Sequence, residues 1–217
     1  MKTVGVLLSG CGVYDGVEIH EAVLTLLALD RKGAKIVSMA PDMDQYHIVN
    51  HLTGEAAEGK RNVLVESARI TRGEIRDLKT VEAAELDALI MPGGFGAAKN
   101  LSDFAIKGKD TEVAADVSRI LNALSDAGKP IGAICISPAV IARALAHRHP
   151  EVTIGNDFGT AEAIETMGAK HMACRVDQIH IDRQNKIVTT PAYMLGPSIK
   201  DVAVGIEKLV DAVLTMA

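Results

Sequence analysis

A cysteine at a predicted junction between a strand and a helix is the residue of this sequence best suited to chemistry. Cys135 follows a short apolar run at 130–134 that is typical of a buried strand, and Pro138 suits the first position of a helix. A side chain at such a turn points outward beside the first free N–H groups of the helix, whose dipole favours an anion. The pattern predicts a nucleophile elbow, with the pKa of the Cys135 thiol lowered from its usual value of about 8.5.

A buried structural cysteine is the alternative interpretation of Cys135, because unpaired cysteines are common in protein interiors. The other two cysteines, Cys11 and Cys174, lack this setting, so we expect no lowered pKa for either. Three cysteines without a CxxC spacing disfavour a disulfide framework and a zinc ribbon. No HExxH spacing occurs either, and we predict neither a metal site nor a cofactor.

Two carboxylates, Glu18 and Glu21, belong to the first predicted helix. Apolar residues recur there with helical spacing over 19–32, before Gly33. We predict Asp15 as the N-cap and Glu18 as its partner in a capping box, which gives Glu18 a structural role. Glu21, one turn further, is not needed for capping and is free for chemistry. A solvated helix face is the alternative for both.

Two glycine-rich turns follow predicted strands. In Pro-Gly-Gly-Phe-Gly at 92–96, small residues let backbone N–H groups approach a ligand, which predicts an anion or oxyanion site. A plain left-handed turn is the alternative. The turn at 10–15 nearly matches a dinucleotide fingerprint, but Asp15 takes the third glycine position, where a side chain hinders the packing of helix on strand. We therefore expect no bound dinucleotide.

Composition limits the class of protein. The chain has 217 residues, of which 48% are hydrophobic and 24% charged, a balance that predicts a single globular domain over 1–217. A net charge of −5 and 3% aromatic residues without tryptophan argue against a nucleic-acid partner. The apolar run at 4–8 is too short for a signal peptide or a membrane span. We expect no membrane partner and a cytoplasmic location.

Strand and helix patterns alternate along the whole chain. This order predicts an α/β fold, a flavodoxin-like doubly wound sandwich with a mostly parallel sheet and helices on both faces. Functional sites of such folds lie beyond the carboxyl ends of the strands. The predicted strands are 3–8, 35–39, 87–91, 130–134, 152–154 and a hairpin of 178–182 with 186–190; the predicted helices are 19–32, 62–70, 111–127, 138–147, 160–167 and 198–215.

Several stretches resemble one protein family. They are Ser-Gly-Cys-Gly-Val-Tyr-Asp-Gly at 9–16, Asn-His-Leu-Thr-Gly-Glu at 50–55, Met-Pro-Gly-Gly-Phe-Gly-Ala-Ala-Lys-Asn-Leu at 91–101 and Thr-Thr-Pro-Ala-Tyr-Met at 189–194. Together with the elbow they are similar to the PfpI-like branch of the class I glutamine amidotransferase-like superfamily, and in particular to its members associated with isoprenoid biosynthesis. The resemblance spans essentially the whole chain.

The resemblance implies roles for individual residues. Cys135 would be the nucleophile, and the carboxylate that contacts it would be Glu21, with Glu18 as the second choice. The N–H groups of Gly94 and Ile136 would bind an oxyanion. Tyr14, in the first matching stretch, is a further candidate for substrate binding. Related proteins are commonly homodimers, and we expect a homodimer here.

The chain departs from its relatives at one position. Where they place a catalytic histidine, this chain reads Val-Thr-Ile-Gly-Asn-Asp with Gly155 at that place. His147 and His149 flank an arginine at a helix end and are expected to be solvated. His20 and His51 remain candidates for pocket residues. Without an oriented histidine, hydrolysis of glutamine by a Cys-His-Glu triad is disfavoured, because nothing protonates the departing amine.

The function implied by the resemblance is that of a glyoxalase without cofactors, which converts glyoxal to glycolate. Its partner would be a small carbonyl compound that adds to Cys135 as a hemithioacetal, while Gly94 and Ile136 hold the oxyanion and Glu21 shuttles a proton. A redox-sensing or binding protein with a reactive Cys135 is an alternative. An amidase or amidotransferase-like subunit is another.

Overall fold

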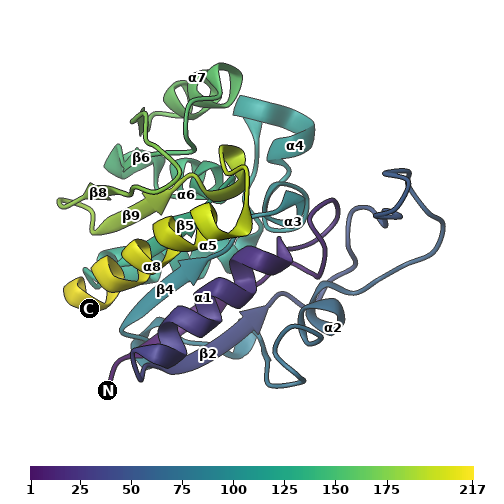
Figure 1. The fold of residues 1–217 in the computed structure, drawn as a ribbon, viewed down its shortest axis with the longest axis horizontal. Helices are drawn as coiled ribbons and strands as arrows, with labels where there is room; N and C mark the ends of the chain where they lie inside the picture. The colour runs from purple at the N-terminus through teal and green to yellow at the C-terminus, as the bar shows by residue number, and fades with distance from the viewer.

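A seven-stranded sheet runs through the middle of the molecule, as the computed structural model of residues 1–217 shows (Figure 1). The strand order is β3-β2-β1-β4-β5-β9-β8, and only β8 is antiparallel to its neighbour. This confirms the predicted α/β class with a mostly parallel sheet. The strands are β1 (Thr3–Leu7), β2 (Lys35–Ala40), β3 (Arg76–Asp77), β4 (Ala88–Met91), β5 (Ile131–Ile134), β8 (His180–Asp182) and β9 (Ile187–Thr190).

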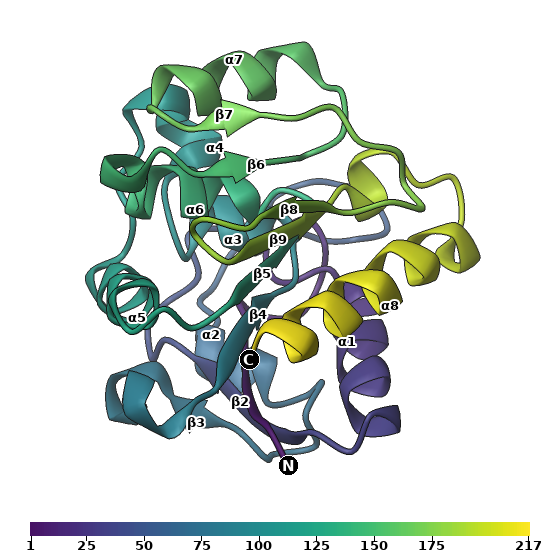
Figure 2. The same ribbon diagram turned by 90° about the vertical axis from the view of Figure 1, so that its left-hand side faces the viewer.

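Helices cover both faces of this sheet (Figure 2). On one face lie α1 (Ile19–Arg31) and α8 (Ile199–Met216), and on the other α5 (Ala115–Asp126) and α6 (Pro138–Ala144). Strand β4 shows why both faces need cover: Leu89 and Met91 join the apolar cluster with α5 and α6, whereas Ile90 joins the cluster with α1 and α8. None of the helices is both long and apolar enough to cross a bilayer.

The smaller elements differ most from the sequence expectation. The strand expected at 152–154 is instead β6 (Glu151–Val152), paired with β7 (Lys170–His171) in a separate two-stranded sheet. The helix expected at 62–70 shrinks to α2, and two short helices were not predicted, because one turn is too short to show a period. These short elements are α2 (Val63–Ser67), α3 (Phe95–Lys99), α4 (Phe104–Lys107) and, of intermediate length, α7 (Phe158–Thr166).

The start of α1 corrects the predicted capping box. Glu18, not Asp15, is the N-cap, and its Oε2 accepts the N–H of Glu21 at 2.7 Å. Asp15 is buried in the preceding turn, where its Oδ2 accepts the N–H of Val49 at 2.8 Å. Asp15 thus ties the turn to the long loop at 41–62, a contact that local spacing does not reveal.

Four parallel strands end at one edge of the sheet and bring together the segments that carry the candidate site residues. The turn at 10–16 follows β1, the glycines at 93 and 94 follow β4, Cys135 follows β5, and the segment at 191–194 follows β9. In the ladder of β5 with β9, Ile134 lies opposite Thr190. The chain segments after these two strands therefore start side by side, as expected for a site of an open α/β sheet.

Candidate active site

Cys135 lies on the predicted turn between β5 and α6. Its φ is +62°, in the left-handed region, and Pro138 is the first residue of α6. A non-glycine residue pays about 1–2 kcal/mol for that conformation, and such residues cluster at functional sites. The Cys135 N–H donates to Thr190 O at 3.0 Å, while the N–H groups of Gly94 and Ile136 donate to its sulfur. The elbow thus presents the thiol to two backbone donors.

The Glu21 carboxyl lies against this thiol. It is fully buried and hydrogen-bonds with Cys135, and its Oε2 and Oε1 accept the N–H groups of Gly93 at 2.8 Å and Tyr193 at 3.2 Å. Gly93 makes this approach possible, because a Cβ there would lie 2.5 Å from the Cys135 Cβ and 2.9 Å from Glu21 Oε2. The structure brings Glu21, rather than Glu18, to the sulfur.

The electrostatics of this pair contradict the lowered thiol pKa. Burial raises the pKa of Glu21 to about 8, helped by the charge of Glu18 and opposed by the backbone N–H groups of Gly93 and Tyr193. Burial, and then the Glu21 charge, raise the pKa of the Cys135 thiol above its usual range, although two backbone donors oppose this. The predicted direction was wrong because the sequence reveals the helix start next to Cys135 but reveals neither the burial of the thiol nor the Glu21 carboxyl beside it. Two adjacent buried acids titrate as one coupled unit.

The other two thiols follow the sequence expectation in direction. Burial is the main cause that raises the pKa of Cys11, and burial also raises the pKa of Cys174. Both side chains are partly exposed, and no disulfide is formed. The charges of Glu66 and Asp15 add to the rise at Cys11, but neither thiol shares a hydrogen bond with a carboxyl as Cys135 does.

A pocket of about 430 Å³ opens above Cys135, whose residue exposure is 7%. Its apolar lining comes from the turn before α1, from α3 and α4, and from the segments after β5 and β9: Val13, Phe95, Ala98, Phe104, Ala105, Ile136 and Met194. The polar groups in the lining are Glu18, Asp157, Thr160 and Tyr193. No lysine, arginine or histidine lines the pocket.

Tyr193 is a site residue that the sequence analysis did not single out. Its side chain lines the pocket, and its hydroxyl lies 2.7 Å from Nδ1 of His20 at the exposed start of α1. The residue before it, Ala192, has a φ of +44°. Burial, together with the charges of Glu18 and Glu21, raises the pKa of Tyr193. The only sign of Tyr193 in the sequence was its place in the family-like stretch at 189–194, and that resemblance implied no role for this residue.

The space beside Gly155, where the resemblance would place a catalytic histidine, is occupied by another side chain. Gly155 has a φ of +103°, and a Cβ there would lie 2.7 Å from Leu195 Cγ. Leu195 therefore occupies space that a histidine side chain would need. His147 and His149 are exposed at the end of the segment after α6, as expected. His20 reaches the pocket only through its contact with Tyr193.

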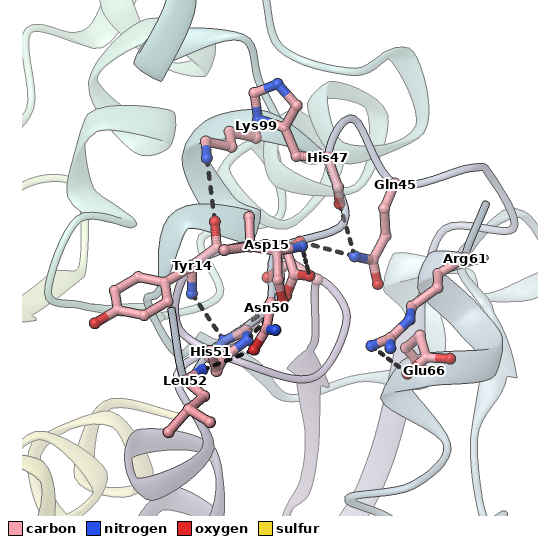
Figure 3. A network of polar contacts seen from close by, with 12 residues as sticks. Tyr14, Asp15, Gln45, His47, Asn50, His51, Leu52, Arg61, Glu66 and Lys99 are labelled. Atoms are coloured by element: carbon pink, nitrogen blue, oxygen red, sulfur yellow. Dashed lines mark hydrogen bonds and ion pairs between the residues drawn. The ribbon is translucent and has the colours of Figure 1, made fainter. Parts of the chain in front are cut away.

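Tyr14 and His51, both expected at the pocket, form a separate network instead (Figure 3). The Tyr14 N–H donates to Nε2 of His51 at 3.2 Å, and their ring centroids are 4.9 Å apart. The Tyr14 carbonyl accepts from Lys99 Nζ at 3.1 Å. Neither side chain lines the pocket, which the turn reaches only through Val13 and the N-cap Glu18. The structure therefore does not bring Tyr14 and His51 to the pocket, because Tyr14 packs against His51 of the loop at 41–62.

Comparison with known proteins places this geometry in a family. The model of the DJ-1/PfpI family matches residues 11–190, a range that includes Glu21, Gly94 and Cys135. The chain belongs to this family. The expected likeness to the PfpI-like branch is thereby confirmed, including its isoprenoid-associated members. A crystal structure of an isoprenoid biosynthesis protein with an amidotransferase-like domain from Ehrlichia chaffeensis superposes with a TM-score of 0.92 at 36% identity, over 99% of this chain and 100% of that one.

Curated relatives of the family correct the expected location. The glutamine amidotransferase-like class 1 domain-containing protein 3, mitochondrial, of Homo sapiens is 49% identical over 98% of this chain and 82% of its own length. The ES1 protein homolog, mitochondrial, of Rattus norvegicus is 47% identical over 98% of this chain and 83% of its own length. These names contradict a cytoplasmic location. Apolar runs alone do not reveal such a location, because mitochondrial transit peptides are amphipathic and rich in arginine.

Proposed function

We propose that this protein is a glyoxalase that needs no cofactor and converts glyoxal to glycolate. The observation that carries the proposal is the contact of the Glu21 carboxyl with the Cys135 sulfur, on which two backbone N–H groups also converge. A nucleophile, a proton acceptor and an oxyanion site are the parts that carbonyl addition requires. Cys135, Gly94 and Ile136 line one pocket, and the buried Glu21 carboxyl hydrogen-bonds with Cys135.

The reaction would begin with addition of Cys135 to one aldehyde carbon. The ionised Glu21 carboxylate takes the thiol proton as the new S–C bond forms, and the C=O electron pair moves onto oxygen. The N–H groups of Gly94 and Ile136, which already point at the sulfur, bind the resulting oxyanion. A donor of this kind lowers a barrier by about 3 kcal/mol.

The second stage moves hydrogen between the two carbons. Glu21 first gives the thiol proton to the oxyanion, which forms the neutral hemithioacetal. The restored carboxylate then removes the proton from the carbon bound to sulfur, which leaves an enediolate, and returns a proton to the neighbouring carbon. The first carbon is oxidised to a thioester while the second is reduced to an alcohol, so no external oxidant is required. Water then breaks the S–C bond and restores the Cys135 thiol. The sum is glyoxal plus water to glycolic acid.

Two features disfavour the alternative functions. A redox-sensing thiol is accessible and has a low pKa, whereas Cys135 is 7% exposed and its pKa is raised. Glutamine hydrolysis needs an acid for the departing amine, and Leu195 takes the space beside Gly155 that a histidine side chain would need there.

A direct assay tests the proposed function. Purified protein with glyoxal, without glutathione or added metal, is expected to form glycolate, detected by NMR. The Cys135→Ser variant is expected to form none, and Cys174→Ser, which alters a thiol outside the pocket, should retain the wild-type rate. Release of ammonia from glutamine that depends on Cys135 would overturn the proposal in favour of an amidotransferase.

We further propose that the protein is a homodimer. Ile19, Val23 and Leu27 are spaced four residues apart on α1 and are 41%, 47% and 40% exposed. This spacing places them in one apolar stripe on a single helix face. A stripe that a core does not cover is a candidate surface for association.

A further inference from the structure

The segment after β9 carries a pocket hydroxyl that the mechanism above does not use. We infer that Tyr193 is a catalytic acid for the substrate oxygen on the carbon not bound to Cys135, and that His20 is the residue that positions its hydroxyl. This inference rests on the proposed glyoxalase function and adds the proton donor that Glu21 alone does not provide.

The backbone aims Tyr193 at the site. β9 ends at Thr190, whose carbonyl accepts the N–H of Cys135, and the chain then turns at Ala192 with a φ of +44°. A left-handed conformation is strained for an alanine. The turn directs the Tyr193 N–H to Glu21 Oε1 at 3.2 Å and places the Tyr193 side chain in the pocket lining. Strain that positions a side chain beside a buried carboxyl is characteristic of a functional segment.

The Tyr193 hydroxyl is prepared to donate. Because burial and two nearby carboxylates raise its pKa, the phenol keeps its proton at neutral pH. His20 Nδ1 lies 2.7 Å from the phenol oxygen. With His20 in its Nδ1–H tautomer, the imidazole donates to that oxygen, which leaves the O–H free to donate into the pocket.

The pair of Tyr193 and His20 also connects the pocket to solvent. His20 is exposed, whereas Cys135 and Glu21 are buried. When Tyr193 gives its proton to the enediolate oxygen, the His20 Nδ1 proton moves to the phenolate while Nε2 of the exposed imidazole takes a proton from solvent, so His20 stays neutral in its other tautomer. The product carboxylic acid later returns a proton to solvent, so the enzyme ends the cycle unchanged.

The first test separates the hydroxyl from packing. Tyr193→Phe keeps the ring, and we expect kcat for glyoxal to fall about 100-fold, the lower end of general acid catalysis. We expect KM to change less than threefold and the rate of Cys135 alkylation by iodoacetamide to stay at the wild-type value, because the thiol and Glu21 are untouched. The matched control is Tyr46→Phe: Tyr46 also packs against a histidine, His47 at 4.5 Å between centroids, but does not line the pocket.

The second test asks whether the two residues act as a unit. His20→Leu is expected to lower kcat about tenfold, and His20→Leu with Tyr193→Phe should be no slower than Tyr193→Phe alone, because coupled groups are not additive. Effects that multiply, or a Tyr193→Phe variant with more than a third of wild-type kcat, would overturn the inference. These outcomes leave the proposed function intact. Absence of any glyoxal turnover that depends on Cys135 would instead overturn both.

Discussion

At the scale of single residues, the protonation of Cys135 and that of Glu21 depend on each other. The sequence placed Cys135 at a helix start, and the structure adds a neutralisable carboxyl that shares the same buried space. A lone helix N-terminus would favour a permanent thiolate. Here burial disfavours two charges, so the pair becomes reactive when it has lost one proton. The activity of this protein is therefore expected to depend on the titration of the pair.

The pH profile of turnover follows from this pair. Because the pKa of Glu21 is raised to about 8, the carboxylate that accepts the thiol proton is scarce below that pH. We expect kcat/KM for glyoxal to rise with pH and to level off above pH 8. Glu21→Gln should abolish turnover at every pH. A profile that is flat between pH 6 and pH 9, measured over a range in which the protein stays folded, would contradict the assignment.

The raised pKa of Glu21 should also make the stability of the folded protein depend on pH, with stability falling as pH rises. Glu21 keeps its proton up to about pH 8 in the folded protein, whereas its reference pKa is 4.5. Between these values the folded state binds more protons than the unfolded chain, so the contribution of Glu21 to the free energy of unfolding falls as pH rises. We expect Tm to decrease from pH 5 to pH 8 and this slope to weaken in Glu21→Gln. An equal slope in the variant would show that Glu21 is not the buried acid responsible.

At the scale of elements, four strand ends and their turns hold the site. The order of long strands and helices was predictable, because β4 and β5 are apolar runs and α1, α5 and α8 have clear periods. The elbow was predictable from the same patterns, whereas the choice of Gly94 and Ile136 as its two backbone donors came from the family resemblance. The Tyr193 contact was not predictable, since it depends on a left-handed Ala192 and on a residue 172 positions away in the chain. The place of Tyr14 likewise depends on the long loop at 41–62.

The turn after β4 offers a test at this scale. A Cβ at Gly93 would lie 2.5 Å from the Cys135 Cβ, so Gly93→Ala must push β4 and β5 apart or move Cys135. We expect this change to reduce turnover at least 100-fold and to destabilise the protein by about 1–3 kcal/mol, as overpacking does. Gly159→Ala is the matched control, because its Cβ would meet nothing closer than 3.9 Å. Equal activity of the two variants would refute the close contact.

At the scale of the whole molecule, the fold accounts for the position of the site but only partly for its reaction. A doubly wound sheet with ligands beyond its strand ends is shared by many unrelated activities. The proposed reaction rests instead on local features: a filled position at Gly155, a buried Glu21 and a pocket with carboxylates but no cations. Such a pocket favours neutral substrates and favours release of an anionic product.

The exposed stripe on α1 gives a prediction for the assembly. If a second copy covers Ile19, Val23 and Leu27, sedimentation at micromolar concentration should show a dimer, and Val23→Glu should shift it toward monomer because a buried unpaired charge is costly. Lys200→Glu, a surface change on α8, serves as the control. A monomeric wild-type protein would remove the homodimer proposal.

The most direct measurement is the position of deuterium in glycolate formed from glyoxal in D₂O. If Glu21 removes and returns a proton next to Cys135, solvent deuterium enters the carbon that becomes the alcohol, and NMR should show one deuteron at that carbon in the wild-type product. Cys135→Ala should give no product. Glycolate with two protons at that carbon, formed equally fast by Glu21→Gln, would indicate direct hydride transfer, and it would contradict the role of the Cys135 and Glu21 pair on which this account rests.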